Sequence, residues 1–189
     1  MKKILLTSLL LVLVSCVTII KAQNKGNSAT DVILKSYSAK MFTSAPVNEN
    51  DLNIILDCGI KAPSARNSQA WKFTVIKNTE LAGEIVRNIT PGNVVVIVSG
   101  IDSQQQGMNS DFDCALATEN MYVAAQSLGY GAHIYASPVG AINQKKDSYG
   151  VPEGYRAIAV LRIGGIDGNV DATSSASTRK SREEIINYK

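Results

Sequence analysis

The 189-residue sequence predicts one domain that combines helices with a central β-sheet, of the α+β or α/β class. Segments with helical spacing of apolar residues alternate along the chain with short segments typical of strands. Residues 94–98 form a continuous apolar run, as expected for a central strand that is buried on both faces. Residues 111–128 form the longest helical pattern and are apolar on most sides, which indicates a helix packed within a core.

The first 22 residues predict an export signal. Lys2 and Lys3 precede an apolar run over residues 4–20, which is short for a membrane span and lacks helical periodicity. Two processing sites fit the pattern: cleavage after Ala22, or a lipoprotein-like box in which Cys16 receives a lipid anchor. A buried first helix or an N-terminal anchor is the alternative interpretation. We therefore expect an exported protein, periplasmic or in the cell envelope, and a lipoprotein if Cys16 is the processing site.

The mature chain differs in charge from the complete one. Lys2, Lys3 and Lys21 account for the formal charge of +3, so cleavage after Ala22 leaves a net charge of 0 and 167 residues. That length suffices for one domain with a core, and no basic field remains that would indicate nucleic-acid binding.

The two cysteines that follow the signal region lie in apolar helical patterns. Cys58 and Cys114 are therefore expected to be buried free thiols. A single disulfide between them is the alternative, since spacing alone does not exclude one.

The first half of the mature chain predicts a linker, two helices and a strand. Residues 23–30 are small and polar, and residues 32–42 predict a helix that runs into a turn. Polar residues 48–50 then cap a second helix, and residues 71–75 open a strand. The apolar face of the second helix consists of Leu52, Ile55, Leu56 and Ile60.

The second half contributes the other strands and helices. Residues 80–88 predict a helix and residues 91–92 a turn, while Gly129 ends the long helix as a C-cap. Strands are expected over residues 132–136 and 156–163. In the last strand, the side chains expected to share one face are Ile158, Val160 and Arg162.

Several kinds of active site do not fit these residues. His133 is the only histidine, and with no Gly-x-Ser-x-Gly motif it is interpreted as a structural residue. No ligand pair has metal-site spacing, so no metal is expected. Asp111, Asp113 and Glu119 are interpreted as a solvated helix face.

The remaining polar groups predict a binding site for FMN. Lys and Arg side chains suit its phosphate, Asn side chains and backbone N–H groups suit the edges of its ring, and apolar walls suit the ring itself. These groups are Ser38, Lys40, Ser64, Asn67, Gln69, Lys180, Ser181 and Arg182.

Residues 62–71, APSARNSQAW, resemble the A-P-S-x-x-N-x-Q-P-W signature of the nitroreductase family of FMN enzymes. Other segments are similar to further parts of this family and follow in the same order. They are residues 36–47, 94–98, 120–131 and 137–140 and the triplet Lys180-Ser181-Arg182. The resemblance implies an α+β, three-layer α/β/α fold over residues 31–189, with a central, mostly antiparallel sheet, built as a homodimer with FMN at the subunit interface.

The resemblance also implies roles for individual residues. Those facing the phosphate and ribityl chain would be Tyr37, Ser38, Lys40, Lys180 and Arg182. Those supplied by the second subunit would be Pro63, Ser64, Ala65 and Asn67. Those along the isoalloxazine ring, in a loop, would be Pro138, Val139 and Gly140, and the Gly140 N–H would donate to flavin N5. Trp71 would be a core residue behind the signature loop.

The implied function is an FMN-dependent oxidoreductase. It would reduce nitroaromatics, quinones or similar acceptors with NAD(P)H in a ping-pong hydride transfer through flavin N5, with no obligatory catalytic side chain. The alternative is an exported flavin-binding or structural module with little turnover, because nicotinamide cofactors are scarce outside the cytoplasm.

Three departures from the family pattern bear on that choice. Ser36 stands where the family has a phosphate-binding Arg, Ala70 where it has Pro, and Gly140-Ala141 where many members have Glu-Gly. Losing one phosphate contact costs about 1.5–3 kcal/mol, which would weaken FMN binding without abolishing it.

Overall fold

The computed structural model describes residues 29–102, 110–167 and 179–189. The chain divides into two units, residues 1–35 and 36–189. The described part of the first unit is helix α2 (Ala29–Lys35), which begins within the expected linker. The prediction of a helix over residues 32–42 is wrong beyond Lys35, because no regular element occupies residues 36–48.

The expected export signal at residues 1–22 lies outside the described residues. Among the helices that the structure describes, none has the length and apolar character needed to cross a membrane.

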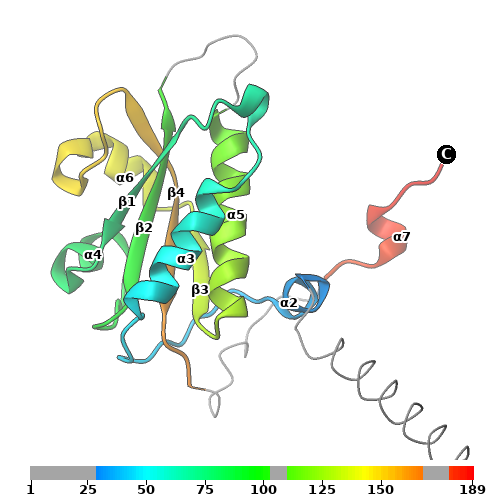
Figure 1. Ribbon diagram of the computed structural model, residues 1–189, viewed down its shortest axis with the longest axis horizontal. Helices are drawn as coiled ribbons and strands as arrows, with labels where there is room; N and C mark the ends of the chain where they lie inside the picture. Colours follow the sequence, from blue (N-terminus) through cyan, green and yellow to red (C-terminus); the bar gives the residue numbers. More distant parts are fainter. Residues whose placement is uncertain (1–28, 103–109, 168–178) are drawn as a thin grey trace, which may run out of the picture. The chain divides into compact units, whose positions relative to one another are not determined.

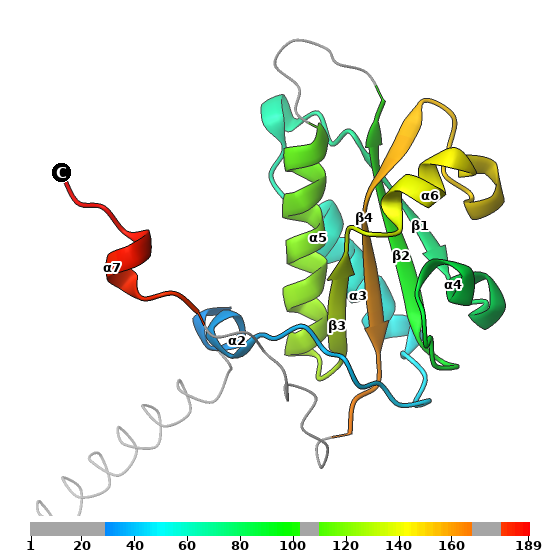
Figure 2. The same ribbon diagram turned by 180° about the vertical axis from the view of Figure 1, so that it is seen from behind.

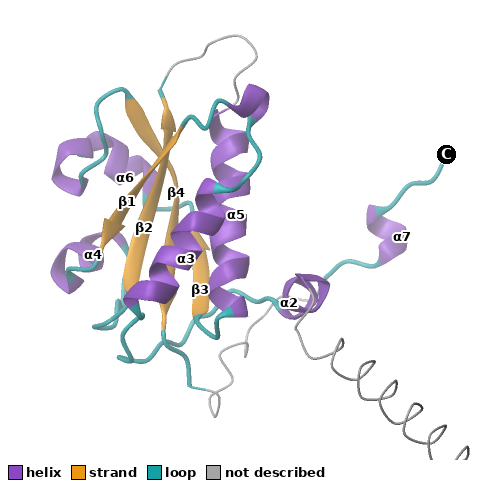
Figure 3. Cartoon of the chain, in the orientation of Figure 1, coloured by secondary structure: helices purple, strands orange, loops and turns teal. Residues whose placement is uncertain are grey.

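A four-stranded sheet forms the centre of the second unit (Figures 1 and 3). Its strands are β1 (Trp71–Ile76), β2 (Val94–Ile101), β3 (Gly131–Tyr135) and β4 (Tyr155–Gly164). They lie in the order β1-β2-β4-β3, and each neighbouring pair is antiparallel. The apolar run predicted to be a buried central strand lies in β2, where residues 94–100 are all buried.

Helices cover both faces of this sheet and give three layers (Figures 1 and 2). One face packs against α3 (Glu49–Ile60) and α5 (Ser110–Ser127), and the other against α4 (Thr79–Ile85) and α6 (Val139–Gln144). The predicted α+β class, three-layer arrangement and antiparallel sheet are therefore confirmed.

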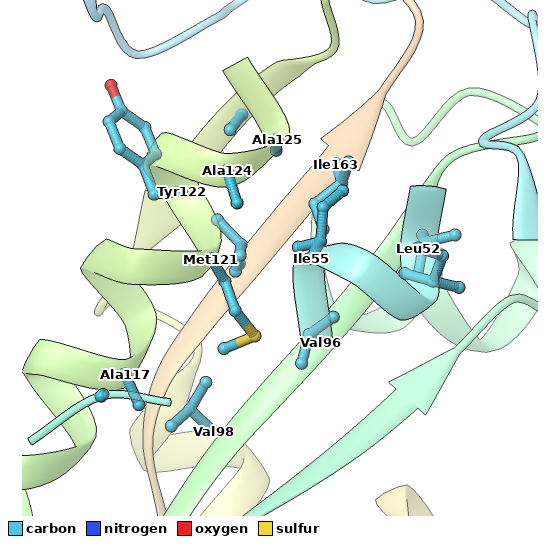
Figure 4. Close-up of a cluster of buried hydrophobic side chains, with 14 of the residues drawn as sticks. Leu52, Ile55, Val96, Val98, Ala117, Met121, Tyr122, Ala124, Ala125 and Ile163 are labelled. Atoms are coloured by element: carbon cyan, nitrogen blue, oxygen red, sulfur yellow. The ribbon is translucent and has the colours of Figure 1, made fainter. Parts of the chain in front are cut away.

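The larger core cluster lies between the sheet and the α3–α5 layer. Figure 4 shows part of it, with Ile55 and Met121 of the two helices near Val96 of β2. Gly59 permits the close approach of the helices, because a Cβ there would lie only 2.7 Å from the Met121 side chain. Trp71 belongs to the same cluster and is 7% exposed, which confirms its prediction as a core residue.

Local sequence accounts for where several helices begin and end. The Asn48 side chain accepts hydrogen bonds from the N–H groups of Asn50 and Asp51 and so caps α3, as predicted. Gly129 has a φ of +87° just after α5, the left-handed conformation of a helix C-cap. Near the C-terminus, Ser181 caps the short helix α7 (Arg182–Ile185) in a capping box with Glu184.

Two details of the predicted apolar faces are wrong. Ile60, at the end of α3, is 52% exposed rather than inward. Ile158 packs with the α3–α5 cluster, whereas Val160 belongs to the cluster on the opposite face. The pairing of β2 with β4 shifts register between Val98 and Ser99, and such a shift reverses the alternation of side chains that a regular strand would keep.

The two cysteines of the second unit are free thiols, as expected, with Cys114 buried and Cys58 half-buried.

Candidate functional site

The segment that begins at residue 36 lies along the free edge of strand β3. The Ala39 N–H donates to the Ala132 carbonyl at 3.0 Å. The Ala39 carbonyl lies 2.7 Å from His133 Nδ1, so His133 anchors this segment and has the structural role that the sequence predicts. Gly131 allows the contact, because a Cβ there would lie 2.9 Å from the Ala39 Cβ.

This anchoring explains the spacing of Ser38 and Lys40. Ala39 is fully buried, whereas Ser38 and Lys40 are both exposed. Side chains alternate along an extended chain, so we expect Ser38 and Lys40 to project together on the side opposite to Ala39. A hydroxyl and an ammonium group would thereby be presented on one side of the segment.

The same segment is tied to the end of the long helix. The Tyr37 N–H donates to Gln126 Oε1 at 3.0 Å, in the last turn of α5. Gln126 Nε2 is buried and has no hydrogen-bond partner among the residues that the structure describes. A polar donor is therefore available next to the residues predicted to bind FMN.

The signature loop has an unusual backbone. It contains the 3₁₀ turn η1 (Ala65–Asn67), and three of its non-glycine residues have positive φ. The values are 55° for Arg66, 54° for Asn67 and 47° for Gln69. Such conformations cost of order 1 kcal/mol each and persist only where surrounding contacts hold them.

Asp113 in the first turn of α5 provides those contacts. Its carboxylate accepts the Ala65 N–H at 3.1 and 3.2 Å and the Ser68 hydroxyl at 3.4 Å. Asp113 is only 1% exposed. The prediction of a solvated face is therefore wrong for Asp113, although Asp111 and Glu119 are exposed.

Sequence reasoning missed Asp113 because an acid in the first turn of a helix usually faces water. The available signal was its position beside Cys114, on the side of the helix that carries the most apolar residues.

Residues 138–140 do not form the loop that was predicted. Pro138 is the N-cap of α6, so Val139 and Gly140 lie in the first turn of that helix. N–H groups in a first helical turn have no intrahelical acceptor, so the Gly140 N–H can donate elsewhere. A Cβ at Gly140 would meet nothing within 4 Å, so there is open space at this position.

Lys180 and Arg182 flank the residue that caps α7. Both are exposed, and an Arg182 N–H donates to the Tyr188 hydroxyl at 3.4 Å. The Ser181 side chain is used in the helix cap, so Lys180 and Arg182 are the residues of the triplet that would contact a phosphate.

The structure places two groups of the predicted site residues, the segment around Ser38 and Lys40 and the signature loop, at opposite ends of α5. Tyr37 contacts Gln126 near its end, and Ala65 contacts Asp113 near its start. Those helix residues are 13 positions apart, which is about 20 Å along the axis. Figure 2 shows the segment from residue 36 beside one end of α5 and the η1 loop beside the other.

No group of His, Cys, Asp and Glu suited to a metal ion occurs in the part of the chain that the structure describes.

Comparison with known proteins relates this arrangement to a family. A sequence profile of the Nitroreductase family matches residues 33–92, which include both groups of site residues before α5. A protein of Archaeoglobus fulgidus, provisionally named NADH dehydrogenase/NAD(P)H nitroreductase, is 27% identical over 138 residues, which cover 67% of this chain and 79% of that protein. Two other curated relatives, 30% and 31% identical, match over only 53% and 48% of their own lengths.

Solved structures show the same fold. A Bacteroides fragilis nitroreductase with bound FMN superposes with a TM-score of 0.69 at 22% identity, covering 86% of this chain and 98% of its own. A Desulfovibrio desulfuricans protein, provisionally a nitroreductase and in complex with FMN, gives a TM-score of 0.73 at 21% identity, covering 87% and 98%. The sequence profile, the curated relatives and the solved structures agree that this chain is similar to members of the nitroreductase family and shares their fold.

Proposed function

We propose that this protein is an FMN-dependent oxidoreductase whose two flavin sites are each shared between the subunits of a homodimer. The observation that carries the proposal is the separation of the two groups of site residues along α5. Neither group alone has the phosphate, ring-edge and ring-face contacts that the cofactor requires, so a second copy of the chain must supply the missing group.

A two-fold symmetric pairing of α5 would meet this requirement. If the axis is perpendicular to α5, the helices of the two subunits run antiparallel, and the start of one lies beside the end of the other. The signature loop of one subunit then approaches the Ser38–Lys40 face of its partner.

Exposed apolar side chains on the α3–α5 layer support this pairing. Four large ones on or directly after these two helices are Ile54, Ile60, Phe112 and Leu128, with exposed fractions of 48%, 52%, 60% and 37%. Apolar groups gathered on one layer are typical of a surface that another protein covers.

The residues present fit the chemistry of FMN. Exposed Lys40, Lys180 and Arg182 would supply charge-assisted donors to the phosphate, and Ser38 a hydroxyl beside Lys40. The Gly140 N–H would donate to the edge of the ring, with Pro138 and Val139 along its face. Asn67 would reach the ring from the partner, in a loop held in its left-handed conformation.

FMN, when bound, supplies hydride transfer at N5, and the chain supplies position and electrostatics. The names of the relatives indicate NAD(P)H as the electron donor, and we propose nitroaromatics or quinones as acceptors. We further propose that the protein acts outside the cytoplasm and acquires FMN after export, since Lys2-Lys3 is not a twin-arginine signal for folded proteins.

Mixed dimers test the shared site directly. Lys40→Glu damages the group near the end of α5, and Asn67→Ala damages the loop near its start. Each variant alone should bind FMN weakly, since both sites of its homodimer are damaged. After unfolding and refolding together in equal amounts, hybrid dimers should regain one intact site each, which restores about one quarter of all sites.

FMN binding would be measured by quenching of flavin fluorescence, with each variant refolded alone as the control. If mixing restores no binding although the wild type binds FMN, the shared site is wrong. If the wild type binds no FMN at micromolar concentration, the proposed cofactor is wrong.

The reaction is tested separately from binding. The flavin-loaded protein should lose its yellow colour with NADH or NADPH and regain it with a nitroaromatic. Retention of the colour with both donors would favour the alternative, a flavin-binding module with little turnover.

A further inference from the structure

We infer that Asp113 is a positioning residue for the flavin site, and that it acts on the cofactor held by the partner subunit. Its carboxylate holds the signature loop in the conformation that presents Asn67. This inference rests on the proposed shared site and adds a residue that touches no cofactor.

The first step of the argument is that the loop needs external support. Arg66, Asn67 and Gln69 have φ between 47° and 55°, a region that side-chain-bearing residues rarely adopt. Within the loop, the Gln69 N–H donates to Ser64 Oγ at 3.0 Å and the Asn67 N–H to the Ser64 carbonyl at 3.0 Å. These bonds close the turn on itself but do not attach it to the domain.

The second step is that Asp113 makes that attachment. It accepts hydrogen bonds from Ala65 and Ser68, which lie on either side of Arg66 and Asn67, and Ser68 directly precedes Gln69. Asp113 is 1% exposed, so these are buried hydrogen bonds to a carboxylate, which are stronger than neutral ones in water. Removing the carboxylate would leave the Ala65 N–H without this acceptor.

The third step is that Asp113 itself is rigidly placed. The next residue, Cys114, is fully buried, and a Cβ at Gly100 would lie 3.1 Å from its Sγ. Ser110 donates a hydrogen bond to the Ile101 carbonyl at the end of β2. The first turn of α5 is thereby locked to the central strand, and Asp113 transmits that rigidity to the loop.

Hydrogen exchange of the flavin-free protein tests the positioning role without the cofactor. In Asp113→Ala, the Ala65 and Gln69 amides should exchange at least tenfold faster, while the Val96 amide in β2 should change far less. Asp113→Asn keeps one oxygen acceptor and should fall between the wild type and Asp113→Ala.

The matched control is Thr118→Val, which removes another buried hydrogen bond of α5, from Thr118 to the Cys114 carbonyl. In Thr118→Val, the exchange rates of the loop amides, divided by the rate of the Val96 amide, should equal those of the wild type. Equal acceleration of the loop and Val96 amides in Asp113→Ala would show only general destabilisation and would overturn the inference.

Mixed dimers then test the action on the partner's cofactor. Asp113→Ala should raise the Kd for FMN at least tenfold, and Thr118→Val by less than twofold. Refolded with Lys40→Glu, Asp113→Ala should regain about one quarter of the sites, because one site of each hybrid is then intact. Refolded with Asn67→Ala, it should regain none, since both changes damage the same half of the site.

The inference would be overturned if Asp113→Ala regained sites with Asn67→Ala but not with Lys40→Glu, or if Asp113→Ala bound FMN with the wild-type Kd. Either result would leave FMN binding by the wild type intact. Failure of the wild type to bind FMN would instead contradict the proposed function, and the exchange rates would still decide whether Asp113 holds the loop.

Discussion

Cys114 shows how burial at a single residue makes stability depend on pH. Burial, and then the negative charges of Asp111 and Asp113, raise the pKa of the Cys114 thiol from 9.0 to about 12. Between these values the folded chain keeps a proton that the unfolded chain loses. The free energy of unfolding therefore falls as the pH rises through this window, by up to about 1.4 kcal/mol per pH unit.

The prediction is tested with Cys114→Ala, which lacks the thiol. The wild type should be more stable than the variant at pH 8, and this advantage should shrink by about 1.4 kcal/mol at pH 10. Urea unfolding under reducing conditions measures both values. Thr118→Val, a change without a titrating group in the same helix, should differ from the wild type by the same amount at both pH values.

Arg162 is a buried cation held by neutral groups. Its guanidinium donates to Asn93 Oδ1 at 2.7 and 3.0 Å and to Thr90 Oγ1, and lies 3.9 Å from the centre of the Phe42 ring. Burial lowers the pKa of Arg162. The position of the Arg162 side chain therefore depends on Asn93, whose side chain packs directly against Gly164.

We predict that Gly164→Ala destabilises the protein by about 2 kcal/mol or more, because it displaces Asn93 from Arg162. A Cβ at Gly164 would lie 2.5 Å from the Asn93 side chain. Gly83→Ala is the matched control, since a Cβ at Gly83, inside α4, would lie at an ordinary contact distance of 3.5 Å from the Ile89 side chain. That change should stabilise by about 0.5–1 kcal/mol in urea unfolding. Equal effects of the two substitutions would contradict this account of Asn93.

At the scale of elements, the C-terminal triplet combines a helix cap with two cations. Ser181 caps α7, so Lys180 and Arg182 can be replaced without removing the cap. The double substitution Lys180→Ala and Arg182→Ala should weaken FMN binding at least 100-fold, because two charge-assisted hydrogen bonds contribute about 3 kcal/mol or more. Fluorescence titration at fixed ionic strength measures the change.

A charge-matched control separates direct contacts of Lys180 and Arg182 with the FMN phosphate from long-range electrostatic attraction by the positive charge of the segment. Arg179→Ala with Lys189→Ala removes the same charge from the same segment and should change the Kd less than about threefold. Similar losses in both double variants would disprove the assigned phosphate contact.

The elements also show how far local sequence patterns reach. The apolar run of β2 and the caps Asn48 and Gly129 depend on neighbouring residues, so the sequence predicts them well. The placement of Ile158 depends on a register shift against β2, which no pattern within β4 contains. Gly140 lies in a helix rather than a loop because Pro138 serves as the N-cap of α6.

At the scale of the whole molecule, the proposal requires that assembly and cofactor binding change together. Phe112→Glu places a charge on the exposed surface of α5, where Phe112 is 60% exposed. It should weaken the dimer at least tenfold, because a charge would be buried at an interface without a partner. FMN binding should fall in parallel.

Sedimentation velocity measures the dimer, and flavin fluorescence measures the binding. Phe112→Leu keeps the surface apolar and should retain both properties. A Phe112→Glu protein that is monomeric yet binds FMN as tightly as the wild type would contradict the shared site.

The sequence by itself determined the class of fold, the family signature at residues 62–71 and the residue types suited to FMN, because periodicity, caps and motifs are local properties of the chain. Only the tertiary structure decided that the two groups of site residues lie at opposite ends of α5, and that Asp113 is buried beneath the signature loop. Ala65 and Asp113 are 48 positions apart, and burial of a polar side chain depends on whatever the fold packs against it.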